Sequence, residues 1–301
     1  MIYVKPTSDI FIKYLFGTEE NKILLLAFIN AVLENSGFSL IEKVELKNTF
    51  NLKKIVFDKE SILDIKATDE SGKIFNIEVQ TSGTGVFNHR TLYYWARLYS
   101  SQLHEGDIYS KLYPAICINI LDFKLFKDFE KYHSTFMIRE KDSPEYFLSE
   151  HLVIHFLELP KLKGLETGKK LTQWLYYLKN EGKEDKTMQI LLKENENIAR
   201  AHEKYIAFTK DEELMDAYEA HIKWKKDYNT GIFNAKEEGR EEGIKKGKEE
   251  GIKKGKEEGI KTNQQKIAVK MLQKGYELKT ICELTGISID ELQQVQINLK
   301  S

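Results

Sequence analysis

The sequence lacks the features that mark secreted and membrane-spanning proteins. It contains two cysteines in 301 residues, Cys117 and Cys282, which lie far apart, so no disulfide framework is expected. The first residues, MIYVKPTSDIFIKYLFG, include no apolar run of signal-peptide type. The longest apolar stretch, residues 23–33, is interrupted by Asn30 and is too short to span a bilayer. These absences predict a soluble protein of the reducing cytoplasm, with no membrane partner.

An excess of either charge is also missing. Lys and Arg number 46 and Asp and Glu number 47, which gives a formal net charge of −1. No global basic field therefore marks the chain as a nucleic-acid binder, and any site for a polyanion must be local. The chain is 41% hydrophobic and 31% charged, which indicates a globular protein with one large domain and an appendage.

Two alternating runs within residues 62–80, ILDIKATDESGKIFNIEVQ, predict a β-hairpin. Apolar and polar residues alternate with a period of two on both sides of the central DESG, as in half-buried strands. Residues 69–72 have the chemistry of a three-residue loop, with Gly72 in the left-handed position. This loop makes Asp69 face Lys73 and fixes the register of both strands.

The predicted register gathers acidic and amide side chains on one face of the hairpin. Counting back from the loop, Asp64 lies opposite Glu78, and Lys66 lies opposite Asn76. Gln80, two residues beyond Glu78, points to the same face. Two paired carboxylates are either solvated or hold a cation. A loop of another length would shift the register and separate them.

Carboxylates on this face suit a divalent metal and a phosphodiester. Mg²⁺ prefers oxygen ligands, and Asp64, Glu78 and the backbone carbonyl of Val79 would supply three. Such an ion polarises the phosphodiester and lowers the pKa of a bound water, which Gln80 can orient. The spacing alone is equally met by acidic residues on a solvated sheet face.

The rest of the pattern predicts an α/β domain followed by helices. Helices are expected over residues 7–16, 20–35 and 88–104, and further strands over 40–48, 112–123, 132–139 and 151–159. Strands and helices alternate in the middle of the chain, so a mixed sheet flanked by helices is expected. The predicted domains are a core (1–164), a helical extension (165–235), a repeat (236–262) and a helical tail (263–301).

Residues 236–261 repeat an octad, GIKKGKEE, with glycine at every fourth position. Its six interior glycines each cost a helix about 0.8–1 kcal/mol relative to alanine. Five Glu-to-Lys pairs at i,i+4 each return only about 0.2–0.5 kcal/mol. Two alternatives are open: a solvated tether, or a helix whose glycine stripe and Ile244, Ile252 and Ile260 pack against another copy.

The tail, residues 263–301, predicts three short helices. Gly275 and Gly286 follow the first two, and Ser288 with Glu291 forms a capping box at the start of the third. Two helices around TGIS resemble a helix-turn-helix, although IDELQQVQ in the third has no basic residue. The alternatives are a small helical interaction module and a DNA reader.

Three stretches carry a family resemblance: SDIFIKYLFG (8–17), DKESILDIKATDESGKIFNIEVQTS (58–82) and RTLYYWARLYSSQLHEGDIYSKLYPAICINILDF (90–123). In this order they resemble the PD-(D/E)XK nuclease superfamily, within it the transposase-like branch of recombination-promoting nucleases. The resemblance covers roughly residues 5–235, and the repeat and tail are similar to the segments beyond the nuclease core in that branch. It implies a restriction-endonuclease-like mixed sheet, Mg²⁺ (or Mn²⁺ as a substitute), and DNA cleavage linked to recombination or mobile elements.

By position in this resemblance, Asp64 is the motif aspartate, Glu78 is the second acid and Gln80 stands at the site of the motif lysine. This branch is similar in carrying glutamine there. Because glutamine has no charge, Lys66 on the same face is a candidate for the missing cation, with an ordinary surface lysine as the alternative. Asp9, at the start of the first helix, either reaches the metal or only caps the helix.

The helix predicted over residues 88–104 carries Arg90, Tyr94 and Arg97 on one stripe beside the hairpin. Two arginines and a phenol suit contacts to phosphate oxygens, and the alternative is ion pairs with nearby acids. His89 has no second His or Cys at ligand spacing, so no zinc site is predicted. The buried side of this helix is expected to consist of Leu92, Trp95, Ala96 and Tyr99.

The sequence therefore predicts a Mg²⁺-dependent DNA endonuclease of low sequence specificity, whose affinity depends mainly on phosphate contacts. The alternative is a nuclease-fold protein that binds DNA or a partner without cutting it. Gln80 in place of a lysine and the near-neutral charge favour that alternative. In both cases the repeat and tail are expected to join copies of the chain into a homo-oligomer.

Overall fold

A computed structural model of the protein describes residues 3–50, 65–83, 85–183 and 185–300. The chain divides into two compact units, Met1–Lys223 and Trp224–Ser301. Each unit has apolar clusters of its own.

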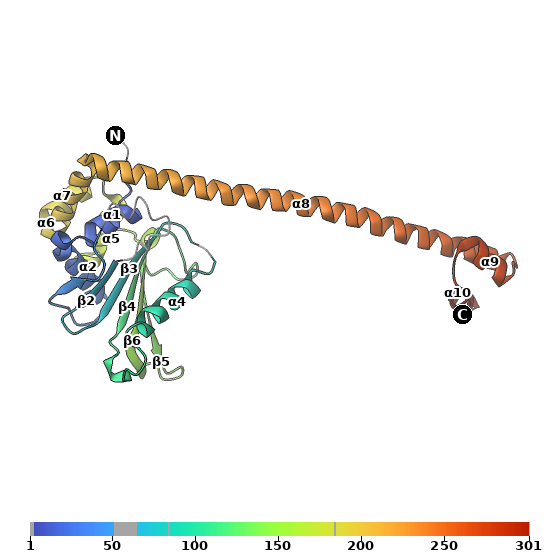
Figure 1. Cartoon of the computed structure of the whole chain (residues 1–301), viewed down its shortest axis with the longest axis horizontal. Helices are drawn as coiled ribbons and strands as arrows, with labels where there is room; N and C mark the ends of the chain where they lie inside the picture. The colour runs from blue at the N-terminus through green and yellow to red at the C-terminus, as the bar shows by residue number, and fades with distance from the viewer. Residues whose placement is uncertain (1–2, 51–64, 84, 184, 301) are drawn as a thin grey trace. The chain divides into compact units, whose positions relative to one another are not determined.

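The first unit is built on a mixed sheet with the strand order β1-β2-β3-β4-β6-β5 (Figure 1). The strands are β1 (Val44–Leu46), β2 (Ile65–Asp69), β3 (Ile74–Gln80), β4 (Ala115–Leu121), β5 (His133–Arg139) and β6 (Phe147–Glu158). β1, β2 and β3 pair antiparallel, β3, β4 and β6 pair parallel, and β5 is antiparallel to β6. This is the mixed α/β sheet that the sequence predicts.

Helices cover both faces of the sheet. α4 (Phe87–Ser100) lies on one face, and α1 (Asp9–Phe16) and α2 (Lys22–Asn35) lie on the other, as Figure 1 shows. α5 (Lys170–Asn180) packs on α2, α7 (Glu196–Lys210) packs on α1 and α2, and α6 (Lys186–Glu194) packs on α5 and α7. Single 3₁₀ turns occur at η1 (Glu19–Asn21), η2 (Tyr109–Lys111) and η3 (Leu159–Lys161). Within the described ranges, no helix combines the length and apolarity that crossing a membrane requires.

β3 alternates its side chains between the two faces of the sheet. Phe75, Ile77 and Val79 are buried in the large core that contains α1 and α2. Glu78 and Gln80 consequently point to the face that carries α4. The candidate acid therefore lies between the central strands and α4.

The β2–β3 hairpin closes with the predicted three-residue loop. Gly72 has φ +89°, in the left-handed region, and the Asp69 N–H donates to the Lys73 carbonyl at 3.0 Å. The side-chain Oδ1 of Asp69 accepts from the Lys73 N–H at 2.8 Å. Lys66 pairs with Asn76, so the register predicted for the described part of the hairpin is confirmed.

The helices predicted near the start and near the end of the first unit are confirmed. Ser8 caps α1 by accepting from the Phe11 N–H, and Gly17 follows the helix. The predicted helical extension contributes α5 to the core, with Trp174, Leu175, Tyr177 and Leu178 buried. The N-terminal helix and the helical extension share one core with the sheet.

A partly buried polar cluster joins the end of α2 to β5 and β6. Asn35 Nδ2 lies 2.7 Å from His133 Nδ1, and His133 Nε2 lies 3.1 Å from His155 Nδ1. Thr135 Oγ1 lies 3.2 Å from that same His155 nitrogen. Burial lowers the pKa of His133 to about 4. Burial and the neighbouring His133 lower the pKa of His155 to about 3, so both rings are neutral in the folded protein at neutral pH.

Acid is expected to destabilise the first unit through these histidines. The pKa values of both histidines in the folded protein lie below the unfolded value near 6.5. Their contribution to the free energy of unfolding is therefore complete above pH 6.5 and is lost as the pH falls towards 4. The free energy of unfolding should fall by about 2 kcal/mol per histidine between pH 7 and pH 5. Urea unfolding at both pH values should show a smaller loss in His133→Gln. The exposed-site variant His104→Gln should match the wild type, and equal losses in both variants would contradict the prediction.

The second unit begins within α8 (Glu212–Gln273) and ends with α9 (Leu278–Thr285) and α10 (Ile289–Lys300). Gly286 ends α9 in the left-handed conformation, with φ 72°. Ser288 and Glu291 form the predicted capping box, in which the Glu291 N–H donates to Ser288 Oγ at 3.3 Å. A small core holds the three helices together, with Ala268, Ile281, Ile287 and Leu292 buried.

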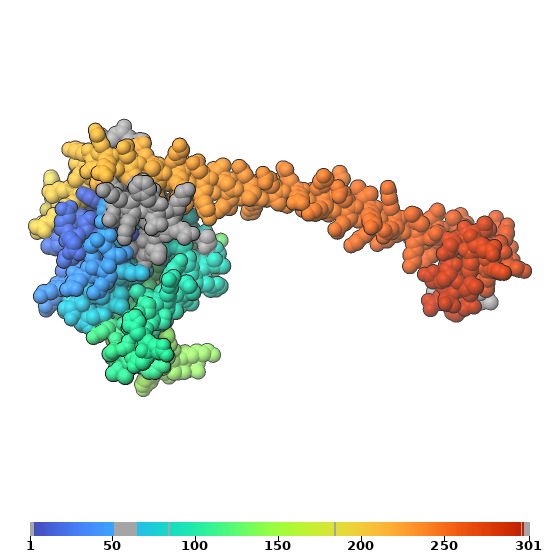
Figure 2. Space-filling view, viewed as in Figure 1, coloured from blue at the N-terminus to red at the C-terminus, as the bar shows by residue number. Residues whose placement is uncertain are grey.

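The glycine-rich repeat is helical, as part of α8, and its packing against another copy stays a prediction. Its side chains are exposed and stand out along the orange segment in Figure 2. A Cβ added to any glycine from Gly239 to Gly259 would meet no atom within 4 Å. No described part of the chain therefore packs against the glycine stripe.

Candidate functional site

Glu78 is the central acid of the candidate site. Its side chain is 15% exposed, and β3 directs it to the face beneath α4. Gln80 Nε2 donates to Glu78 Oε1 at 2.6 Å. The Arg90 guanidinium of α4 donates through Nη2 to the same oxygen. One carboxylate oxygen thus accepts from both an amide and a guanidinium.

Arg90 reaches Glu78 from the first turn of α4. Its Cζ lies 5.6 Å from the centre of the Phe87 ring and 5.8 Å from that of the Tyr94 ring. Its Nε is buried, and no described residue accepts a hydrogen bond from it. The side chain as a whole remains 40% exposed. The guanidinium therefore keeps donor capacity beyond its contact with Glu78.

Lys66 and its cross-strand partner Asn76 lie on the same face of the sheet as Glu78, on the side away from Gln80. The Lys66 N–H donates to Asn48 Oδ1 at 2.7 Å, and its carbonyl accepts from Lys47 N–H at 2.8 Å, so its backbone bonds on the β1 side. Lys66 and Asn76 therefore form a cross-strand pair without mutual backbone hydrogen bonds, and pairs of this kind bring their side chains closest together. Asn76 is 7% exposed, and its Oδ1 has no donor among the described residues. It is a buried oxygen on the site face.

Asp64, the predicted motif aspartate, lies outside the described residues. The pairing of Asp64 with Glu78 stays a prediction. The described pairs of the hairpin begin with Ile65 and Ile77, and they follow the register from which that pairing is predicted. Val79 lies two residues beyond Ile77. Because carbonyls alternate between the two neighbours of a strand, the Val79 carbonyl points to the β2 side, where Asp64 is predicted.

Asp9 begins α1 and lies beside a residue that the sequence does not suggest. His221 Nε2 of α8 is 3.4 Å from Asp9 Oδ2. The two side chains are 14% and 13% exposed, respectively. They are separated by 212 positions in the chain, and no motif links them, so only the fold brings them together. A role of Asp9 at the metal stays a prediction.

α4 is rotated relative to its predicted orientation. Its inward residues are Phe87 and Thr91, and Trp95 is half-buried, with Nε1 donating to the Ala115 carbonyl at 2.9 Å. Leu92 and Ala96 are exposed, so the prediction that they are buried is wrong. In this orientation Arg90 reaches Glu78, and the Leu92 side of the helix faces solvent.

The three residues predicted to contact phosphate are therefore not equivalent. Arg90 forms an ion pair with Glu78, the alternative that the sequence leaves open. Tyr94 adjoins Arg90 and is 40% exposed. Arg97 is exposed on the same helix. The site thus offers one arginine at the acid and a second one further along α4.

Two residues near the site were missed from the sequence. Asn119 of β4 lies beside Glu78 in the sheet and is 2% exposed, with Nδ2 donating to the His155 carbonyl at 3.1 Å. The Asp122 N–H donates to the Gln80 carbonyl at 2.9 Å, and its carboxylate pairs with Lys5. Asn119 is the polar residue of the strand AICINIL, which is a signal that could have identified it.

The donor set fits a divalent ion that prefers oxygen, provided that Asp64 completes it. Across residues 3–50, 65–83, 85–183 and 185–300, no group of three or more His, Cys, Asp or Glu side chains is placed to hold a metal. Glu78 supplies one carboxylate, and Asn76 Oδ1, which accepts no hydrogen bond from any described residue, is a buried oxygen on the same face. Carboxylate and amide oxygens suit Mg²⁺ and Mn²⁺.

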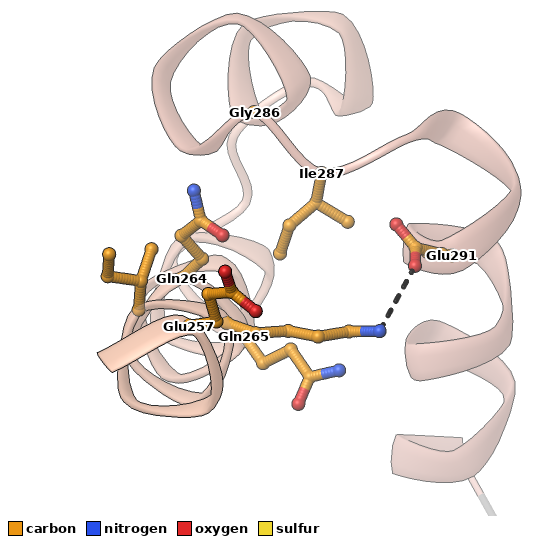
Figure 3. Close-up of a pocket in the computed structure, with 8 residues that line it drawn as sticks. Glu257, Gln264, Gln265, Gly286, Ile287 and Glu291 are labelled. Carbon is orange, nitrogen blue, oxygen red and sulfur yellow. Dashed lines mark ion pairs between the residues drawn. The ribbon is translucent and has the colours of Figure 1, made fainter. Parts of the chain in front are cut away.

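The second unit has a pocket of about 310 Å³ between α8 and α10, shown in Figure 3. Ile287 points into it, and a dashed line joins Lys261 Nζ to Glu291 Oε1, which are 3.9 Å apart. The labelled lining residues are Glu257, Gln264, Gln265, Gly286, Ile287 and Glu291. These amides and opposite charges form no catalytic constellation, so the candidate site remains at β3.

Comparisons with known families match two segments of the chain. Residues 6–235 match the model for the PD-(D/E)XK nuclease family transposase. Residues 261–296 match the model for the Rpn/YhgA-like nuclease family, C-terminal HTH domain, in agreement with the resemblance of the tail to a helix-turn-helix. No curated protein and no solved structure matches the chain. Because the first match spans most of the chain, the protein belongs to the PD-(D/E)XK nuclease family transposases and carries an Rpn/YhgA-like C-terminal helix-turn-helix domain.

Proposed function

We propose that the protein is a DNA endonuclease of low sequence specificity that uses Mg²⁺, with Mn²⁺ as a substitute. The observation that carries this proposal is Glu78, a largely buried carboxylate at the position of the second motif acid in a chain of this nuclease family. PD-(D/E)XK nucleases generally use divalent metals. When bound, such an ion supplies polarisation of the phosphodiester and activation of the attacking water.

The residues of the site take separate roles in this proposal. Asp64 and Glu78 hold the ion with their carboxylates, and Val79 holds it with its backbone carbonyl. Gln80, which already donates to Glu78 at 2.6 Å, orients the attacking water. Lys66 supplies the positive charge that the motif lysine would give.

Further residues bind the substrate or support the metal ligands. Arg90, Tyr94 and Arg97 contact the phosphates along the DNA backbone. Asp9, at the start of α1 and 3.4 Å from His221 Nε2, is a further candidate to reach the metal. The helix-turn-helix adds DNA contacts of its own, and the repeat and tail join copies of the chain. The family points to a setting in recombination or mobile elements.

Cleavage of supercoiled and linear DNA tests the proposed function directly. The wild type should nick and linearise a plasmid in Mg²⁺ or Mn²⁺ and should be inactive in EDTA. Asp64→Ala should be inactive under all these conditions while keeping the circular dichroism spectrum of the wild type. Cleavage by Asp64→Ala at the wild-type rate would show that the activity comes from another site or a contaminant. A wild type that cuts neither substrate with either ion would contradict the proposal.

A second candidate function is DNA or partner binding without cleavage. It is favoured by the contacts of Glu78 Oε1, which accepts from both Gln80 and Arg90. An acid held in this way can serve as a structural group. Isothermal titration with Mn²⁺ separates the two functions, because a binding module has no need to hold the ion.

A further inference from the structure

We propose that Arg90 couples metal binding to DNA binding by exchanging Glu78 for a phosphate. The inference rests on the proposed function, since it requires Glu78 to be a metal ligand. Without the ion, the guanidinium is paired with the carboxylate. When the ion takes the carboxylate, Arg90 turns to solvent, where its donors meet the DNA backbone.

The first step is a competition for one oxygen atom. Glu78 Oε1 already accepts from Gln80 Nε2 at 2.6 Å and from the Arg90 guanidinium. A divalent ion bound to this oxygen would stand next to the guanidinium, and two positive charges at that distance repel each other. The ion and the Arg90 contact therefore exclude each other at Glu78.

The second step depends on how loosely Arg90 is held. Its side chain is 40% exposed, it has a single ion-pair partner among the described residues, and its buried Nε has no described acceptor. Because the incoming ion takes over the charge of Glu78, releasing Arg90 leaves no carboxylate without a positive partner. The guanidinium fork fits two phosphate oxygens, and a phosphate would give Nε the acceptor that it lacks.

The third step follows from thermodynamic linkage. If the ion releases Arg90 for DNA, bound ion tightens DNA binding, and bound DNA tightens ion binding by the same factor. This coupling adds to any direct contact between the ion and the phosphate. It is specific to Arg90, because Arg97 is exposed on the same helix and has no described contact with Glu78. Arg97 is therefore the matched control.

Isothermal titration with Mn²⁺ in the absence of DNA tests the competition. Arg90→Ala should bind Mn²⁺ about three- to fivefold tighter than the wild type, because its competitor for Glu78 is gone. Arg97→Ala, which loses the same charge, should bind Mn²⁺ as the wild type does. Arg90→Lys should lie between the wild type and Arg90→Ala. Unchanged or weaker Mn²⁺ binding by a folded Arg90→Ala would overturn the inference.

Fluorescence anisotropy with a labelled oligonucleotide tests the coupling. Binding is measured in EDTA and in Ca²⁺, and a gel confirms that the oligonucleotide is intact. Ca²⁺ should tighten DNA binding by the wild type more than by Arg90→Ala. Arg97→Ala should weaken binding equally in both conditions and keep the full gain from Ca²⁺. A full gain in Arg90→Ala would overturn the inference.

The two possible failures are distinguishable. A wild type that binds no Mn²⁺, or a Glu78→Ala variant that binds it as the wild type does, would overturn the proposed function together with the inference. A wild type that binds Mn²⁺ and cuts DNA would preserve the proposed function whatever Arg90 does. The inference alone then fails if Arg90→Ala gains no Mn²⁺ affinity.

Discussion

Glu78→Gln is expected to lower metal-dependent DNA cleavage by at least about 1000-fold, since a metal ligand of this kind contributes several kcal/mol to the transition state. The substitution keeps the shape of the side chain. Its amide oxygen can still accept from Gln80 and Arg90, as Oε1 of Glu78 does. The fold should therefore persist while the charge that holds the ion is lost. The initial rate of plasmid nicking at saturating Mg²⁺ measures the effect.

Glu70→Gln is the matched control for this variant. Glu70 lies in the loop of the same hairpin, and its exposed carboxylate accepts from the N–H groups of Glu42 and Lys43 at 3.1 and 3.0 Å. Its substitution removes the same charge far from the site face, so the cleavage rate should stay within about twofold of the wild type. Equal losses in both variants would assign the effect to the hairpin rather than to the metal site.

Lys161→Met is expected to lower the free energy of unfolding by about 3–5 kcal/mol, because it leaves a buried charge without its partner. Lys161 Nζ donates to Glu158 Oε2 at 2.6 Å and to the Phe126 carbonyl at 2.7 Å. Both charged side chains are 0% exposed. The other oxygen of Glu158 accepts from the Leu125 N–H at 2.6 Å, so the pair also fixes the segment after β4. Urea unfolding measures the loss.

Two further variants define the origin of this loss. Lys163→Met removes an exposed lysine nearby and should change the stability by less than about 0.5 kcal/mol. The double variant Glu158→Gln/Lys161→Met removes both charges and should recover part of the stability. If Lys161→Met were no less stable than Lys163→Met, the buried pair would not have the assigned role.

The parts of the fold that the sequence predicts well are set by neighbouring residues. The hairpin loop follows from DESG, because Gly72 can adopt the positive φ that the loop requires. The capping box of α10 follows from Ser288 and Glu291 for a similar reason, since both partners lie within one helical turn. The mixed sheet follows from the order of alternating and continuous apolar runs.

The parts that the sequence does not predict depend on how whole elements pack. The alternation of β3 places Glu78 on the correct face, but the rotation of α4 decides that Arg90 reaches it and that Leu92 stays at the surface. The pairing of Asp9 with His221 joins distant helices. β1 is shorter than the predicted strand over residues 40–48, because it pairs with β2 through only three residues. Such contacts leave no local pattern.

The glycine stripe of α8 has a geometric consequence for any partner helix. Four residues turn an α-helix by about 400°, so each glycine from Gly239 to Gly259 is offset by about 40° from the one before. Over the whole stripe the glycines turn by about 200°, and a straight partner loses contact with them after about two turns. A repeat longer than 3.6 residues per turn favours a right-handed path. A second copy that follows these glycines must therefore wind around α8 with the opposite hand to a heptad coiled coil.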